Sequence, residues 1–311
     1  MSSIPLLSNS SESSSDEERG SNDRGMITRK EANEKLLTDE LLSDVKLRGA
    51  DGKTVLAIRS LLAARSTVFR SMLYGSFEEA KKDIVDIGNY NSIVLQYLVE
   101  FIVTEDSKLF ETNFTNMSNE EEKESVESIV SLVDAASFFA IPELASKAMD
   151  VTLSWLRNQK SLMCLFLDAC ERSGPSVLEI QDHVLSMIRS DPKLLLLAEA
   201  HPVSILSSSQ MVAILKDRKI NASEIIRFKI LKAWSNVSTM KDSSVSSTPN
   251  KEASNRDFRK RKAAELSSHL ELQYISPIDL STALPPLASC PLKALLMRTK
   301  YRLFGRQCTN L

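Results

Sequence analysis

The sequence is poor in the residues on which most enzyme chemistry depends. Its 311 residues include only three histidines, His183, His201 and His269, and none stands beside a nucleophile in a recognisable motif. The eight glycines form neither a Gly-x-Gly-x-x-Gly pattern nor a phosphate-binding P-loop. The sequence therefore favours a protein that is not an enzyme and needs no cofactor, since a hydrolase would require a nucleophile and base that no motif identifies.

Cysteines are also few and widely spaced. The four are Cys164, Cys170, Cys290 and Cys308. They lack the paired spacing of a zinc site and are too sparse to staple a small secreted domain. We therefore expect a reducing compartment.

Long apolar runs and a strong net charge are both missing. The longest apolar stretch, around residues 194–198, is far shorter than the roughly 20 residues of a membrane span. Residues 1–24 contain no apolar run of signal-peptide length. A formal charge of -2 gives no overall attraction to nucleic acids or membrane surfaces. We expect a cytoplasmic or nuclear protein, or one found in both places, with neither nucleic acid nor membrane as a partner.

The N-terminal segment, residues 1–30, is rich in serine and acidic residues. Its centre, residues 13–18, reads Ser-Ser-Ser-Asp-Glu-Glu. So few apolar side chains cannot offset the entropy of ordering the chain, which predicts a disordered tail. The serines suit an acid-directed kinase, and a purely solubilising tail is the alternative.

The next segment alternates between helical and strand patterns. A leucine stripe predicts a short helix, followed by alternating residues 43–48, an Asp51-Gly52 turn and alternating residues 54–59, which together indicate a β-hairpin. Residues 60–73 have a helical pattern and 83–87 predict a third strand. The fold class is therefore α+β.

Helices dominate from there onward. Apolar residues within 94–102 share one helix face, and further helices are predicted at 126–133 and from Pro142. Between the first two of these helices, residues 104–125 are polar and predict a long exposed loop.

The second half contains no strand pattern. Helices are predicted over residues 161–171, 176–188, 209–215, 221–237, 263–272 and 291–303. The 221–237 helix has a capping signal in which Asn221 precedes Glu224 by three residues. Residues 238–256, rich in Ser, Thr and Asn, predict a flexible insertion.

A short basic run follows that insertion. It consists of Arg259, Lys260, Arg261 and Lys262. The run suits recognition by a nuclear-import receptor, and the alternative is the solvated start of a helix.

Three motifs in the first half carry a resemblance to a known family. Residues 42–47 read Leu-Ser-Asp-Val-Lys-Leu, residues 57–66 contain Leu-Leu-Ala-Ala-Arg-Ser, and residues 68–73 read Val-Phe-Arg-Ser-Met-Leu. With the later 135–144 segment, they resemble a BTB (POZ) domain. The resemblance implies a small sheet capped by helices over residues 31–158. Residues 159–311 are more weakly similar to the helical BACK domain that often follows a BTB domain.

One motif position departs from the family pattern. Ile58 stands where BTB members commonly carry a histidine, just before the basic residue that here is Arg59. Asp44 and Arg59 are both kept. We expect these two side chains to form a structural ion pair, because a partly buried carboxylate needs a partner.

The BTB resemblance implies both a homodimer and a cullin-3 partner. The dimer interface is expected at Leu36, Leu37, Leu41, Leu42, Leu61 and Leu62, where a leucine-rich surface marks an interface. Cullin-binding members carry a hydrophobic residue, any residue, then Glu after the second BTB helix, and Phe77 and Glu79 match this arrangement. The resemblance thus implies a substrate-recruiting adaptor of a cullin-3 ubiquitin ligase, with an unknown protein substrate. The alternative is a non-ligase dimeric scaffold, which the basic run would direct to the nucleus, since no substrate-reading repeat is visible.

Overall fold

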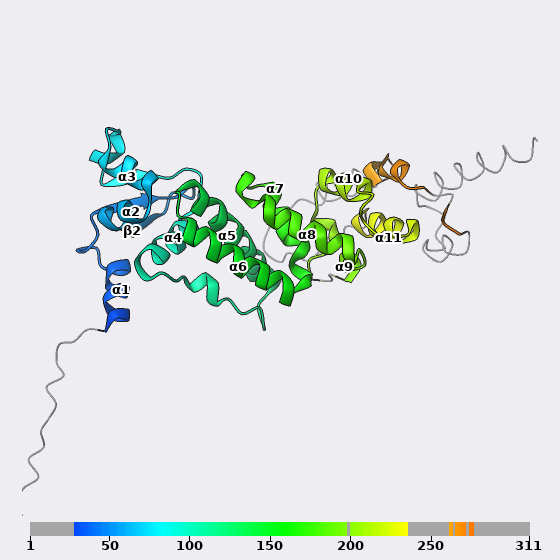
Figure 1. Ribbon diagram of the computed structural model, residues 1–311, viewed down its shortest axis with the longest axis horizontal. Helices are drawn as coiled ribbons and strands as arrows, with labels where there is room; N and C mark the ends of the chain where they lie inside the picture. Colours follow the sequence, from blue (N-terminus) through cyan, green and yellow to red (C-terminus); the bar gives the residue numbers. More distant parts are fainter. Residues whose placement is uncertain (1–27, 198–199, 236–260, 264, 272–273, 277–311) are drawn as a thin grey trace, which may run out of the picture.

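The computed structural model describes residues 28–197, 200–235, 261–263, 265–271 and 274–276 (Figure 1). The first half contains α1 (Arg29–Thr38), β1 (Val45–Arg48), β2 (Thr54–Ala57), α2 (Arg59–Arg65), α3 (Thr67–Tyr74), η1 (Glu78–Lys81), β3 (Ile84–Asp86), α4 (Ser92–Thr104), η2 (Lys108–Glu111), α5 (Asn119–Phe138) and α6 (Pro142–Asn158). The second half contains η3 (Lys160–Leu162), α7 (Met163–Glu171), η4 (Pro175–Val177), α8 (Leu178–Ser190), α9 (Leu194–Leu197), η5 (Val203–Ile205), α10 (Ser208–Lys216), α11 (Glu224–Ser235) and η6 (Ser267–His269).

The sheet confirms the predicted hairpin and third strand. Its order is β2-β1-β3, with β1 antiparallel to β2 and parallel to β3. Gly52 closes the hairpin with a φ of 77°, a conformation that a residue without a Cβ adopts at little cost. Alternation buries Val45 and Leu47 on the core side of β1.

The predicted helical stretch over 60–73 divides into α2 and α3 at Ser66. The Ser66 hydroxyl accepts a hydrogen bond from the Phe69 backbone N–H at 3.0 Å, which caps α3. It donates to the Phe139 carbonyl at 2.5 Å. The Phe69 and Phe139 rings then stack with centroids 4.2 Å apart, so this break fixes how α3 meets the end of α5.

The long exposed loop expected over 104–125 is not what the structure shows. Helix α5 begins at Asn119, where Ser118 and Glu121 form a capping box. The remaining loop buries Leu109 and Phe114. Glu120, Glu121 and Glu122 lie in the first turn of α5, where negative charge interacts favourably with the helix dipole. The acidic run that indicated a loop is therefore the start of a helix.

Helix α5 also joins the two halves of the chain. Its Asp134 accepts hydrogen bonds from Tyr90 Oη at 3.0 Å and from the Ser176 hydroxyl. Arg172, at the end of α7, pairs with Glu127 of α5 at 2.8 Å. Burial and the Asp134 carboxylate together raise the pKa of Tyr90, which keeps its hydroxyl protonated as the donor.

Helices α7, α8 and α10 overlap the predicted ranges 161–171, 176–188 and 209–215, whereas α9 was not predicted and α11 begins later than expected. The helix starts at Glu224, so Asn221 does not cap it as expected. The Glu224 carboxylate instead accepts from the Glu271 backbone N–H at 2.9 Å. Arg227, one turn later, donates to the carbonyls of Leu215 and Ile220 and so ties α11 to the end of α10.

Several predictions fall wholly or partly outside the described residues. They are the N-terminal tail up to residue 27, the 238–256 insertion, the 291–303 helix, Cys290, Cys308, Arg259 and Lys260. At the edge of the tail, α1 begins at Arg29 with Thr28 as its cap, slightly earlier than expected. No helix in the part of the chain described is long and apolar enough to cross a membrane.

Candidate protein-interaction site

The loop after α3 presents an aromatic side chain to solvent. Phe77 is 59% exposed, and Tyr74 at the end of α3 is exposed to a similar degree. Gly75 lies between them, where a Cβ would collide with the Ser71 carbonyl oxygen. An exposed aromatic of this size is a typical anchor for a protein partner, because burying it in a complex removes a large apolar area from water.

A carboxylate stands beside this aromatic on the short helix η1. The Glu79 side chain is 37% exposed and its Oε1 lies 3.8 Å from Lys82 Nζ. The Phe77 carbonyl accepts from the Ala80 backbone N–H at 3.2 Å, which starts the turn. We call residues 75–81 the Phe77 loop. It carries an exposed apolar side chain and a nearby carboxylate on one short turn.

Asp44 and Arg59 meet in the structure, although not as the predicted ion pair. The Asp44 carboxylate accepts from the Arg59 backbone N–H at 2.7 Å, at the first turn of α2. The Arg59 guanidinium donates to three backbone carbonyls, those of Asp44, Ala80 and Lys82. The physical reason is that the backbone carbonyls at the end of η1 need hydrogen-bond donors, and the planar Arg59 guanidinium can donate to several of them at once.

This geometry gives Arg59 a positioning role that the sequence pattern did not reveal. Its bonds to Ala80 and Lys82 tie the end of the Phe77 loop to the start of α2. The spacing of Asp44 and Arg59 gave a contact but no indication of the carbonyl acceptors. The only indication of these acceptors was the pairing of β1 with β3. That pairing brings the residues just before β3 close to those just before β1.

The leucines expected at a dimer interface divide into two groups. Leu41 is 92% exposed and Leu42 is 46% exposed, so both are available to a partner. Leu36, Leu37 and Leu61 are half-buried, the last two against the core. Leu62 is only 1% exposed and belongs to the core. The prediction for Leu62 is therefore wrong, because its helical phase turns it inward on α2.

Two cysteines and one histidine of the described residues are buried in the fold, whereas His183 and His269 are half-buried. Burial raises the pKa of both the Cys164 and the Cys170 thiols to about 12, so neither is a ready nucleophile. His201 is buried and lies 2.6 Å from Glu122 of α5. No group of three or more His, Cys, Asp or Glu within the described ranges is placed to hold a metal ion.

Comparison with known families agrees with this three-stranded, helix-covered first half. The family model of the BTB/POZ domain matches residues 33–153. Residues 33–153 form a BTB/POZ domain. BTB/POZ domains commonly dimerise and bind other proteins, so this domain is a protein-interaction module. No curated protein matches the chain.

The BTB/POZ domain is followed by a helical region, which gives an α+β fold with a helical second part. The matched domain ends within α6, and α7 then packs against α5 of the domain. The similarity of this helical region to a BACK domain stays a prediction. The Arg261 and Lys262 end of the basic run lies in a helical segment, where Lys262 pairs with Glu265 at 2.9 Å.

Proposed function

We propose that this BTB/POZ protein acts as a homodimeric, substrate-recruiting adaptor of a cullin-3 RING ubiquitin ligase. The observation that carries the proposal is the exposure of Phe77 beside Glu79 on a loop clamped by Arg59. A pre-ordered loop pays less entropy on binding than a mobile one. Phe77 would fill an apolar pocket of the cullin while Glu79 fixes the register.

The direct test is calorimetry of the full chain with the N-terminal part of a cullin-3 scaffold. The double variant Phe77→Ala/Glu79→Lys is expected to lose binding by at least about 2 kcal/mol, the size of a hot-spot loss. The matched control is Tyr274→Ala/Glu179→Lys, which removes an exposed aromatic and reverses an exposed carboxylate in the helical half. Equal binding by the parent and the Phe77 variant, with the fold intact, would refute the adaptor role.

The dimer is proposed to use the exposed leucines before β1. The variant Leu41→Glu/Leu42→Glu is expected to shift the protein from dimer to monomer in light scattering, because charges in an apolar interface are costly. Leu197→Glu, at another highly exposed leucine, is the control. A parent chain that is monomeric at micromolar concentration would contradict the dimer.

A non-ligase dimeric scaffold that enters the nucleus is the second candidate. It is favoured by the sequence, which has a basic run but no recognisable substrate-reading repeat. This role predicts no cullin binding together with nuclear accumulation that is lost when Arg259, Lys260, Arg261 and Lys262 are replaced by alanine. Diffuse distribution that is unchanged by these replacements would remove the nuclear part.

A further inference from the structure

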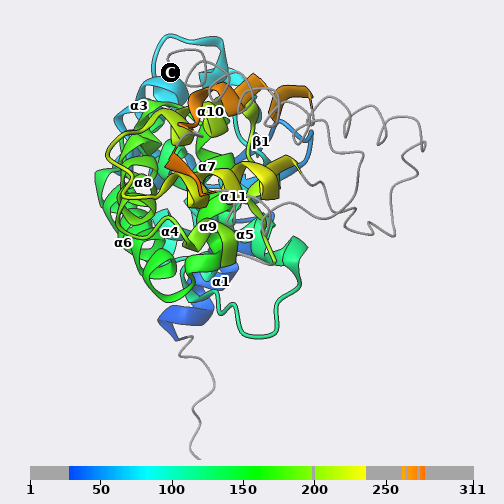
Figure 2. The same cartoon turned by 90° about the vertical axis from the view of Figure 1, so that its right-hand side faces the viewer.

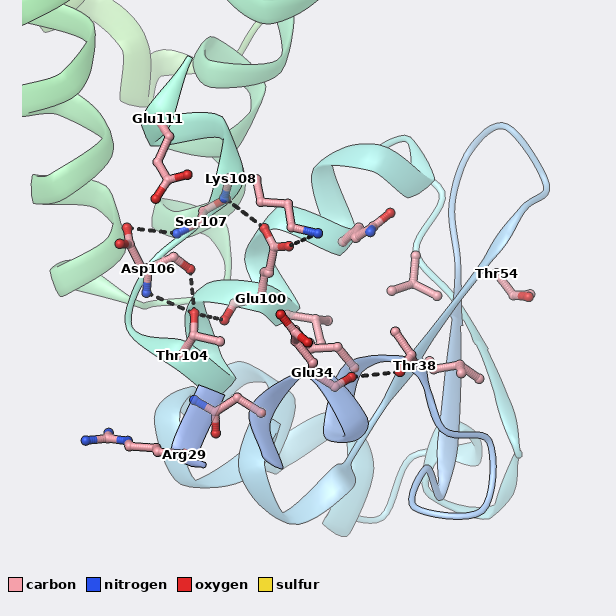
Figure 3. A pocket seen from close by; sticks show the side chains of 16 residues that line it. Arg29, Glu34, Thr38, Thr54, Glu100, Thr104, Asp106, Ser107, Lys108 and Glu111 are labelled. Carbon is pink, nitrogen blue, oxygen red and sulfur yellow. Dashed lines mark hydrogen bonds and ion pairs between the residues drawn. The ribbon is translucent and has the colours of Figure 1, made fainter. Parts of the chain in front are cut away.

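A cavity of about 800 Å³ lies between α1, β2, α4 and η2 (Figure 3). Its apolar lining comes from Leu37 of α1, Val55 and Leu56 of β2, and Val99 of α4. The volume lies within the range of ligand-binding cavities, which are mostly apolar with a few convergent polar groups. We call it the α1 groove.

One wall of the α1 groove contains a buried carboxylate. The Glu100 side chain is only 7% exposed and belongs to the mostly apolar helix α4. Its Oε2 accepts from the Ser107 hydroxyl at 3.2 Å and from the Lys108 backbone N–H at 3.0 Å. Figure 3 shows the carboxylate between the backbone N–H and the ammonium group of Lys108.

The second oxygen of Glu100 is less well satisfied. Its Oε1 lies 3.8 Å from Lys108 Nζ, which is too long for a hydrogen bond. The Lys108 side chain is 82% exposed, so it is free to move away. A buried carboxylate gains strongly from a close cation, because unpaired charge in a low-dielectric site is costly.

The charge of the α1 groove favours the same kind of ligand. Two cationic side chains line it, Arg29 and Lys108, against four carboxylates, of which Asp106 is also paired with Lys147 at 3.0 Å. The carboxylates are Glu34, Glu100, Asp106 and Glu111. A cationic group is therefore attracted to the groove, whereas an anionic one is repelled.

The floor of the groove is the edge of the sheet. Strand β2 is terminal in the order β2-β1-β3, and its Thr54, Val55 and Leu56 line the cavity. An edge strand can accept an extended peptide, whose main chain supplies affinity while side-chain pockets supply specificity.

We propose that the α1 groove binds an extended, basic peptide segment of a partner protein. Its main chain lies along β2, a lysine or arginine side chain reaches Glu100 Oε1, and neighbouring aliphatic side chains contact Leu37 and Val99. The binding cation displaces the Lys108 ammonium group into solvent.

This site is separate from the Phe77 loop. Helix α1 and helix α3, which leads into that loop, lie on opposite sides of the BTB/POZ domain in both views (Figures 1 and 2). The groove residues include none of the Phe77 loop. Peptide binding and cullin binding are therefore measurable independently, and failure of one leaves the other standing.

The test uses the full chain and a probe peptide of alternating valine and lysine, five residues long, acetylated and amidated. Backbone amide resonances of Thr54, Leu56 and Lys108 are expected to shift on titration. The same peptide with glutamate in place of lysine is expected to cause no shift. Equal shifts with both peptides, or shifts confined to other surfaces, would overturn the proposal.

Two variants with opposite expected effects sharpen the test. Glu100→Gln keeps the side-chain shape and is expected to weaken binding about tenfold, as for loss of one charge-assisted hydrogen bond. Lys108→Met removes the exposed ammonium group that faces Glu100 Oε1, and is expected to strengthen binding about threefold by removing the competing cation.

Matched controls separate this site from general electrostatic attraction. Glu179→Gln and Lys193→Met make the same charge changes at exposed positions of the helical half and are expected to leave affinity unchanged. Should Glu100→Gln unfold, Lys108→Met against Lys193→Met still decides the question. Equal affinities of those two variants, or a dimer that does not bind the lysine peptide at all, would contradict the proposal.

Discussion

Two loops of the BTB/POZ domain treat their aromatic residues in opposite ways. The Phe77 loop leaves Phe77 59% exposed, whereas the loop after α4 buries Phe114 to 9% exposure. Phe114 meets Trp155 of α6 edge to face, with ring centroids 4.9 Å apart. The difference shows that an aromatic side chain in a polar loop stays exposed where no helix from elsewhere in the chain packs against it.

The strongest way to break this comparison is to remove each aromatic. Phe114→Ala is expected to lower the free energy of unfolding by about 3 kcal/mol, because it empties a packed site. Phe77→Ala is expected to change it by less than about 0.5 kcal/mol, as at an exposed position. Urea denaturation followed by circular dichroism measures both. Equal losses would mean that Phe77 is also part of the core.

The carboxylates associated with the two loops give a second test. Glu100→Ala is expected to cost about 2 kcal/mol, since the Ser107 hydroxyl and Lys108 N–H lose a charged acceptor. Glu79→Ala is expected to cost less than about 0.5 kcal/mol, since its contact with Lys82 is partly solvated. Denaturant midpoints of the two variants check this difference, which a Glu79 loss as large as that of Glu100 would contradict.

The clamp on the Phe77 loop predicts a local effect of Arg59→Ala. Loss of the bonds to Ala80 and Lys82 is expected to speed trypsin cleavage after Lys81 about tenfold, equivalent to about 1.4 kcal/mol of local opening. Cleavage after Lys108, in the other loop, serves as the internal control. If both sites accelerate together, Arg59 stabilises the whole domain rather than this loop.

The smallest expected effect concerns pH and the loop after α4. A hydrogen bond from Lys147 lowers the pKa of Asp106, so the native state favours the ionised carboxylate. The Asp106–Lys147 pair therefore stabilises the fold fully above the pKa that Asp106 has in the unfolded chain. This stabilisation is lost as the pH falls through the lowered pKa of the folded state, below about pH 4. The pair is largely exposed, so the loss stays under about 1 kcal/mol. Denaturation at pH 7 and pH 3 should show it in the parent and not in Lys147→Met.

The fold was predictable where one periodicity governs a segment. Alternation around Asp51-Gly52 predicted the hairpin, and the spacing of Val94, Leu98 and Phe101 predicted the buried face of α4. The loop over 104–125 was not predictable in this way. Its acidic residues are compatible with either a loop or a helix N-terminus, and Leu109 and Phe114 show no period.

The candidate site was predictable in part. The motif identified Phe77 and Glu79, and their order along the chain placed them after α3. The role of Arg59 and the inward direction of Leu62 were missed. Both depend on segments distant in sequence, because carbonyl acceptors and core contacts come from whichever element the fold brings near.

The sequence by itself determined the small hairpin, the helical second half and the BTB motifs, because local periodicity and short-range turn chemistry set these features. Only the tertiary structure decided that Phe77 faces solvent while Phe114 packs on Trp155, and that Glu100 of α4 is buried beside the cavity that β2 also lines. Exposure depends on long-range packing, since a side chain is buried only when separate elements close around it.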